Sequence, residues 1–248
     1  MGSLGIGDAT AGCGADSAPL TRMLQTEYAF GAEARSTGAL QRYSTVADVA
    51  GSGDLGFTAG PWSYTADRSR EDGHFLTIWK RDADCRWRLE FDARVLHSRP
   101  EIAEPALPPE GGSPVPIAAP PPQLMANDPV GRAISDFQGT AQGDGFSAAL
   151  RTYGRNDGFV LYADTELPMG RASADRYLAK RPIVTAWKQD SEGRSADTTL
   201  AYSLGEFSDA HGRSRHSYVQ IWQYDPKVAN WGLRILLIGV VAPPSKKS

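Results

Sequence analysis

Apolar and polar residues alternate along several short stretches of the chain, and this alternation predicts β-strands. In TLAYSLGEF (199–207), Leu200, Tyr202 and Leu204 fall on one face of an extended strand, and the residues between them fall on the other. A related strand, DLGFTAGPW, stands at 54–62. The chain therefore carries one kind of strand twice.

The strongest organisational signal is an internal repeat of five segments in one order. The matched pairs are TEYAFGAEA (26–34) with SDFQGTAQG (135–143), ALQRY (39–43) with ALRTY (149–153), LGFTAGPWSY (55–64) with LAYSLGEFSD (200–209), HFLTIWKRD (74–82) with SYVQIWQYD (217–225), and RWRLEFDARVL (86–96) with NWGLRILLIGV (230–240). The first pair predicts an amphipathic helix, and the last three predict an antiparallel meander of three strands in each half.

Turn residues stand between the predicted strands. Asp72-Gly73 and His211-Gly212 are good tight-turn pairs, and Asp225-Pro226 and the stretch 82–84 lead into the last strand of each half.

The second copy is longer than the first. The offset between matched residues grows from 110 positions at Tyr43 and Tyr153 to 145 at Phe57 and Tyr202, so the second copy holds 35 more residues. These residues predict a short strand at 159–162, a helix at about 172–180 and a strand at 183–188.

Segments rich in proline or small residues divide the chain. A loose leader covers 1–18, and the proline-rich stretch 99–127 predicts an extended linker, because proline neither donates to a sheet nor continues a helix. We therefore expect a shortened repeat at 19–98, a fuller repeat at 128–243 and a tail at 244–248.

The order of helix, variable segment and long antiparallel sheet resembles the nuclear-transport-factor-like cone fold, which includes ketosteroid isomerases and SnoaL-like cyclases. The run from Gly53 to Thr58, then Ile78-Trp79, then Trp87 to Asp92, is similar to the sheet of uncharacterised bacterial SnoaL-like proteins. The resemblance implies an α+β protein of tandem cone-fold repeats, each a helix packed on a curved antiparallel sheet. It leaves the chemistry open, because one fold hosts many functions.

The first copy departs from this pattern, because it lacks the segment that walls the pocket of the cone. We expect it to be a structural half with a three-stranded sheet, packed on the second copy as an intramolecular pseudo-dimer, and a homodimer of the whole chain is a further expectation. The acid typical of the family, Asp92, aligns with Leu236 in the second copy.

Composition and charge exclude some partners. The net charge of −3 gives no electrostatic reason to expect nucleic acid or an anionic membrane, and no apolar run approaches the roughly 20 residues of a membrane span. We expect a soluble protein, cytoplasmic as the sequence stands and periplasmic if an export signal was removed. Cys13 and Cys85 favour two free thiols over a single disulfide.

Sequence motifs give little support for a cofactor site or a metal site. GSGDLG (51–56) has dinucleotide-binding spacing, but Gly60-Pro61 follows where a helix should begin. His211 and His216 flank a basic turn, which favours a solvated turn over a metal site. We expect neither cofactor nor metal.

The pocket of the second copy is the remaining candidate site. Asp164 follows a buried strand, and a carboxylate in an apolar pocket has a raised pKa that suits a general base. The ligand-binding candidates are Tyr162, Arg171, Tyr177, Trp187, Tyr202 and Tyr218.

Each candidate has a structural alternative: a turn for Asp164, an ion pair for Arg171, and sheet core for the aromatic residues. Two functions therefore stand. One is a non-catalytic module that binds a small apolar ligand or serves association, and the other is a cofactor-independent isomerase, cyclase or dehydratase with Asp164 as base.

Overall fold

A computed structural model gives the fold, and it describes residues 23, 39–66, 69–97, 128–163, 165, 168–180, 184–209 and 215–240. Six expectations lie outside this part of the chain: the leader at 1–18, the helix at 26–34, the linker at 99–127, Asp164 as a base, the turn at His211-Gly212 and the tail at 244–248. The domain boundaries therefore stay a prediction.

The first sheet has five strands and is built from the first half of the chain. Its strands are β1 (Ala39–Arg42), β2 (Val46–Val49), β3 (Leu55–Ala66), β4 (Ser69–Arg81) and β5 (Trp87–Leu96). Strands β3, β4 and β5 form the expected antiparallel meander, while β1 and β2 both pair with β3. The expectation of a three-stranded first sheet is therefore wrong, because β1 and β2 extend it.

The second sheet has six strands in the order β7-β6-β11-β10-β9-β8. They are β6 (Gly154–Tyr162), β7 (Met169–Gly170), β8 (Val184–Arg194), β9 (Leu200–Asp209), β10 (Arg215–Asp225) and β11 (Asn230–Val240). Strands β8 to β11 are antiparallel, whereas β6 pairs with β11 in parallel. The mixed helix and antiparallel-sheet class is confirmed.

Three helices cover the outer face of the second sheet: α3 (Pro129–Gly143), α4 (Gly145–Tyr153) and α5 (Arg171–Leu178). Asp128 is the N-cap of α3, and its carboxylate accepts a hydrogen bond from the Gly131 amide at 3.2 Å. Its buried residues recur at helical spacing and face the sheet, so α3 is held by packing rather than by propensity.

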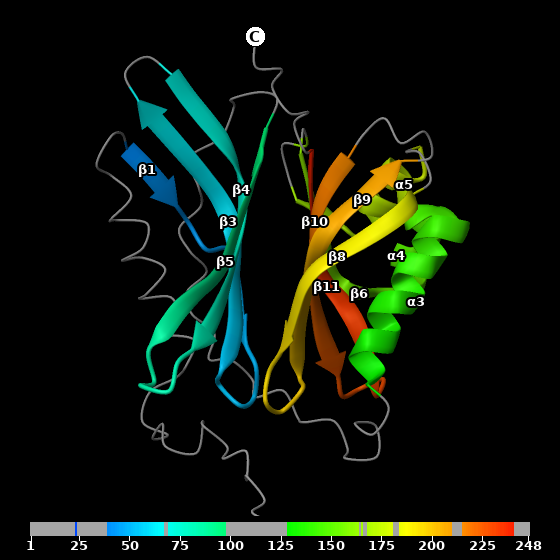
Figure 1. Ribbon diagram of the computed structural model, residues 1–248. Helices are drawn as coiled ribbons and strands as arrows, with labels where there is room; N and C mark the ends of the chain where they lie inside the picture. The colour runs from blue at the N-terminus through cyan, green and yellow to red at the C-terminus, as the bar shows by residue number, and fades with distance from the viewer. Residues whose placement is uncertain are drawn as a thin grey trace, which may run out of the picture.

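The layers run in the order first sheet, second sheet, helices (Figure 1). One apolar cluster joins the facing sides of the two sheets. The first sheet side contributes Ala50, Leu55, Phe57, Ala59, Leu76, Ile78 and Val95, and the second contributes Leu161, Leu200, Tyr202, Val219, Ile221, Ile235 and Leu237. Full burial of each large side chain stabilises the fold by about 1.5–3 kcal/mol, so this shared core is a major source of stability.

Both meanders carry a β-bulge next to a buried tryptophan. The register shifts between Ile78 and Trp79 in the first sheet and between Ile221 and Trp222 in the second. The two tryptophans are 1% and 0% exposed and point away from the shared core, Trp79 toward Met23 and Trp222 toward the helices. A bulge bends the strand that carries it, so both sheets curve at equivalent places.

Two turns of the same shape, 50–55 and 195–200, precede the corresponding strands β3 and β9. In each, the amide of the first residue donates to the carbonyl of the last at 2.9 Å. In each, the fourth residue has a positive φ, 70° at Gly53 and 50° at Thr198.

The two turns bind each other reciprocally. Backbone amides of each donate to side-chain oxygens of the other: Gly51 to Thr199 Oγ1 (3.1 Å), Ser52 to Asp197 Oδ2 (2.7 Å) and Ala196 to Asp54 Oδ2 (2.9 Å). Equivalent positions exchange equivalent hydrogen bonds, as in an isologous interface.

Two segment-level expectations are wrong. Asp72-Gly73 is not a turn, because β3 and β4 stay paired as far as Ala66 and Ser69. The stretch 39–43 is not equivalent to the helical 149–153, because residues 39–42 form β1 beside β3. The structural correspondence between the halves is strongest in the two meanders.

The expectation of two free thiols is also wrong. Cys85, in the turn between β4 and β5, is disulfide-bonded. The only other cysteine of the chain is Cys13, which lies outside the described residues.

Replacing Asp197 with Ala should destabilise the protein by about 2 kcal/mol. Its carboxylate accepts hydrogen bonds from the Ser52 amide at 2.7 Å and from the hydroxyls of Ser195 and Thr199 at 2.7 and 2.9 Å, and part-buried donors left without an acceptor are costly. Urea unfolding measures the effect. The control Asp84→Ala removes an acid whose side chain is 73% exposed and should change stability by less than about 0.5 kcal/mol. Equal losses would contradict the reciprocal-turn interface.

A histidine pair stands at the edge of the shared core. His74 Nδ1 lies 2.5 Å from His97 Nε2, and His74 is 5% exposed. Burial, together with the charge of His97, lowers the pKa of His74 from 6.5 to about 4. Protonation of His74 therefore opposes folding.

His74 takes up a proton at a higher pH in the unfolded chain than in the folded chain. The free energy of unfolding therefore falls as the pH falls from 6.5 to 4, by about 3 kcal/mol in all. We expect His74→Leu to remove this part of the acid sensitivity in urea titrations from pH 8 to 4. A variant with the same slope as the wild type would show that His74 does not cause it.

Candidate functional site

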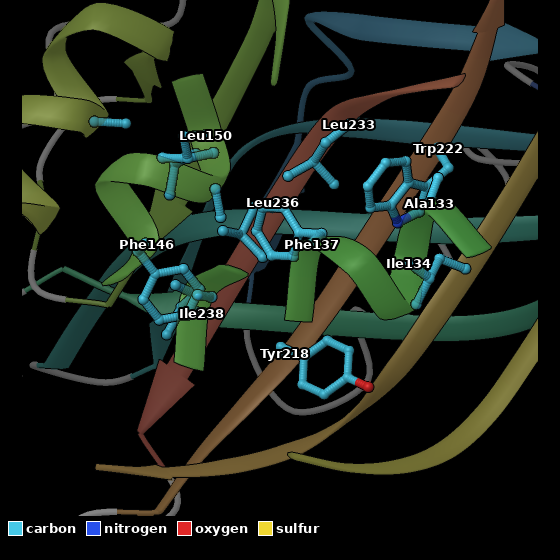
Figure 2. Packing of buried hydrophobic residues seen from close by; sticks show 14 of the residues in the cluster. Ala133, Ile134, Phe137, Phe146, Leu150, Tyr218, Trp222, Leu233, Leu236 and Ile238 are labelled. Carbon is cyan, nitrogen blue, oxygen red and sulfur yellow. The ribbon is translucent and has the colours of Figure 1, made fainter. Parts of the chain in front are cut away.

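The candidate site is the concave face of the second sheet, under α3, α4 and α5. Strand β10 runs along it and presents every second residue: His216, Tyr218, Gln220, Trp222 and Tyr224. Figure 2 shows Phe137 of α3 among Leu236, Leu233 and Trp222 of the sheet. Helix and sheet side chains therefore meet in one apolar interior.

Aromatic rings fill much of this interior. Trp187 of β8 lies 5.0 Å from Phe207 and 4.9 Å from Tyr218, measured between ring centroids, and Phe207 stacks on His216 at 4.9 Å. Phe146 of α4 meets Phe207 edge-on at 5.3 Å. Such contacts suit a flat apolar ligand, and they also suit a core.

Some of the rings that border the interior are less deeply buried. Tyr162 lies 5.5 Å from Tyr177 of α5 and 6.5 Å from His216, between ring centroids. Tyr177, His216 and Trp187 are half-buried, so their rings are partly open to solvent. Tyr162, Tyr177, Trp187 and His216 are called the mouth residues below.

A line of uncharged polar side chains crosses the concave face. Tyr218 receives a hydrogen bond from Gln138 Nε2 of α3 at 3.3 Å, and its hydroxyl lies 3.5 Å from Ser203 Oγ. Ser203 donates to Gln189 Oε1 at 3.2 Å, and Gln220 is paired with Ser203 across the strands. These five residues are called the polar strip.

The polar strip is electrically neutral. Burial raises the pKa of Tyr218, and the carboxylates of Asp190 and Glu192 add to this effect, so the phenol stays protonated at neutral pH. The strip can exchange hydrogen bonds with a guest but offers no charge to one.

The structure brings together four of the six predicted ligand residues: Tyr162, Tyr177, Trp187 and Tyr218 all border the concave interior. Asp164, the predicted base, lies outside the described residues, and its role stays a prediction.

Tyr202 does not join them. It is paired with Ile221 across the strands and belongs to the shared core between the sheets. Its hydroxyl donates to Glu90 of β5 at 2.8 Å, and burial together with this contact raises its pKa to about 12. The expectation that Tyr202 faces the same interior as Tyr218 is wrong, because the two fall on opposite faces of the sheet.

Arg171 also lies apart from the mouth residues. Its Nη1 donates to the Gly154 carbonyl at 3.1 Å, at the end of β6 opposite to Tyr162. This contact joins the first residue of α5 to the end of α4, which is a structural role.

The family-like acid of the first half is paired within its own sheet. Asp92 Oδ1 accepts from Arg42 Nη2 at 2.9 Å and from Thr77 Oγ1 at 2.7 Å. The Arg42 guanidinium also lies 3.9 Å from the centre of the Phe75 ring. Asp92 is held in a largely buried ion pair.

Five residues of the site are not predicted from the sequence: Gln138, Gln189, Ser203, His216 and Gln220. The signal was present for two of them: His216 and Gln220 alternate with Tyr218 and Trp222, and therefore share their face of the strand. The arginines that surround His216 in the sequence favour a solvated turn instead.

Among the described residues, no group of three His, Cys, Asp or Glu side chains could hold a metal ion. None of the helices that the structure describes is long and apolar enough to cross a membrane.

No protein-family model matches the sequence, and no curated protein matches it. Solved structures with similar folds include a candidate ketosteroid isomerase from Parabacteroides distasonis, with 11% identity, a TM-score of 0.40, and coverage of 50% of this chain and 96% of that one.

Two other solved structures also have similar folds. One is an NTF2-like protein from Cytophaga hutchinsonii, with 9% identity, a TM-score of 0.38, and coverage of 47% of this chain and 98% of that one. The other is a DUF4783 family protein from Bacteroides uniformis, with 12% identity, a TM-score of 0.37, and coverage of 47% of this chain and 100% of that one. Similarity at this level carries no argument about function.

Gly193→Ala should destabilise the protein by about 1–3 kcal/mol, because the new Cβ would collide with the Tyr202 ring. The ring would have to move, and this would strain the hydrogen bond from the Tyr202 hydroxyl to Glu90. In α3, Gly139→Ala is the matched control. A Cβ there meets nothing within 4 Å, so helix propensity should stabilise the protein by about 0.5–1 kcal/mol. Thermal unfolding of both variants measures this, and a neutral Gly193→Ala would contradict the placement of Tyr202.

Proposed function

We propose that this protein is a non-catalytic binding module of two tandem units. The second unit holds a small, uncharged, largely apolar molecule at its concave face, and the first unit is a built-in sheet partner. The neutral, aromatic character of the concave face is the observation that carries this proposal.

The mouth residues support ligand binding at the less buried end. Tyr162, Tyr177, Trp187 and His216 come from four separate elements. Tyr162 contacts Tyr177 and His216, Trp187 is linked to His216 through Phe207, and Tyr177, Trp187 and His216 are half-buried. Partly exposed aromatic rings beside an apolar interior provide area for a guest at small entropic cost.

The absence of an acid or base in the polar strip favours binding over catalysis. An isomerase needs a group that takes a proton from carbon, and the strip consists of Gln138, Gln189, Ser203, Tyr218 and Gln220. Tyr218 has a raised pKa, which makes it a weaker acid than a free phenol. The strip can position a ligand without activating it.

The first unit is proposed as a partner on the evidence of the sheet contact. The shared core and the reciprocal turns join the two meanders through equivalent positions, with the bulges at Trp79 and Trp222 also matched. A duplicated chain that packs on itself would explain why these contacts are symmetric.

Two fluorescent probes test the binding function: Nile red, which is neutral and carries a ketone, and diphenylhexatriene, which is a pure hydrocarbon. We expect the full chain to bind both with saturable enhancement of fluorescence. Trp187→Ala should weaken both by about tenfold, since it removes a large aromatic contact.

The control is Leu96→Ala, which shortens an apolar side chain of the first sheet that is 51% exposed, and its affinities should equal those of the wild type. Circular dichroism checks that each variant is folded. Failure of both probes to bind the wild type, or binding that Trp187→Ala leaves unchanged, would overturn the proposed function.

A further inference from the structure

The side-chain amide of Gln220 lies at the centre of the concave face. Gln220 is 0% exposed, and its neighbours across the strands are Ser203 on β9 and Leu236 on β11. A polar group at such a place is costly unless it has a hydrogen-bond partner.

One end of this amide is fixed. Trp222 Nε1 donates to Gln220 Oε1 at 3.0 Å, and an indole nitrogen can only donate. The oxygen must therefore face Trp222, and a flipped amide would bring two donors together. The nitrogen faces the other way.

The nitrogen end has no acceptor in the part of the chain that the structure describes. Gln220 Nε2 is buried and makes no hydrogen bond to any described group. Buried polar groups are rarely left without a hydrogen-bond partner, so we expect the Gln220 amide to donate to an acceptor that the protein itself does not supply.

The polar strip connects this amide to the protein surface. From Gln220 it runs through Ser203 and Tyr218 to Gln138, which is half-buried, and Gln189, which is exposed. Both outer glutamines have long unbranched side chains that can change rotamer, and they lie on α3 and β8. The strip therefore reaches the surface beside Trp187, a mouth residue whose Nε1 donates to the Gln138 carbonyl at 3.2 Å.

The charged side chains near the polar strip limit which chemical class of ligand could accept this hydrogen bond. Asp190 and Glu192 lie close enough to raise the pKa of Tyr218, while the nearby cation Lys188 is exposed and paired with Asp190 at 2.8 Å. A carboxylate brought into the strip would lose its water without gaining a cation, because Lys188 is paired with Asp190 and Arg194 lies 3.6 Å from Glu192. The ligand must therefore accept a hydrogen bond without carrying a negative charge.

We propose that Gln220 Nε2 donates to the carbonyl oxygen of a neutral, otherwise apolar ligand, with Tyr218 and Ser203 beside it. This inference rests on the proposed function and adds to it the chemical class of the ligand, a ketone, ester or amide rather than a hydrocarbon or a fatty acid. The aromatic rings of the interior would contact the apolar remainder.

The test compares three probes: Nile red, diphenylhexatriene and the carboxylate cis-parinaric acid. In Gln220→Met the dissociation constant for Nile red should rise about tenfold, as expected for one lost hydrogen bond, and that for diphenylhexatriene should stay within about twofold. Wild-type protein should bind cis-parinaric acid at least tenfold more weakly than Nile red.

Leu236→Met is the matched control, because it alters packing beside Gln220 without removing a donor. It should change the affinities for Nile red and diphenylhexatriene by the same factor. A second measurement needs no variant: the side-chain amide resonances of Gln220 in the ¹⁵N spectrum should shift on addition of Nile red and stay in place with diphenylhexatriene.

The outcomes separate the two proposals. Wild-type protein that binds neither Nile red nor diphenylhexatriene overturns the binding function and this inference together. Binding of both with equal losses in Gln220→Met, or with amide resonances that Nile red leaves unmoved, overturns the inference alone and assigns the amide to a buried water.

Discussion

The contact between the two sheets is the interaction on which the rest of the structure depends. Each sheet has one face in the shared core, so neither could stand in water without exposing Leu76 and Ile78 on one side or Val219 and Ile221 on the other. Reciprocal hydrogen bonds between turns 50–55 and 195–200 fix the relative position of the sheets. Apolar burial supplies the stability, and the directional bonds supply the register.

This contact also determines which side chains can serve a ligand. Because successive residues of a strand point to opposite faces, Ile221 is committed to the other sheet, and Gln220 and Trp222 are left to the helices. The concave face therefore acquires its aromatic and amide lining from the positions that the shared core does not use. The proposed binding surface and the contact between the sheets therefore lie on opposite faces of the same strands.

The sequence predicts the meanders well, because alternation and the paired tryptophans are local signals. The sequence predicts less well which face of a sheet each side chain occupies. Tyr202 and Tyr218 look alike in sequence, but the pairing of Tyr202 with Ile221 places it in the shared core. Asp72-Gly73 resembles a turn, yet β4 continues through it. A Cβ at Gly73 would collide with the Val95 carbonyl of β5 and then with the Trp62 indole, so the glycine lets both lie close to the strand. Such outcomes depend on cross-strand register, which a single sequence does not encode locally.

Native-state hydrogen exchange tests the shared core most directly. If the two sheets depend on one core, the strand amides of Leu76 and Ile78 should exchange with the same free energy as those of Val219 and Ile221, through one cooperative opening. Exchange of the first-sheet amides at a free energy lower by several kcal/mol, with the second sheet still protected, would contradict the account.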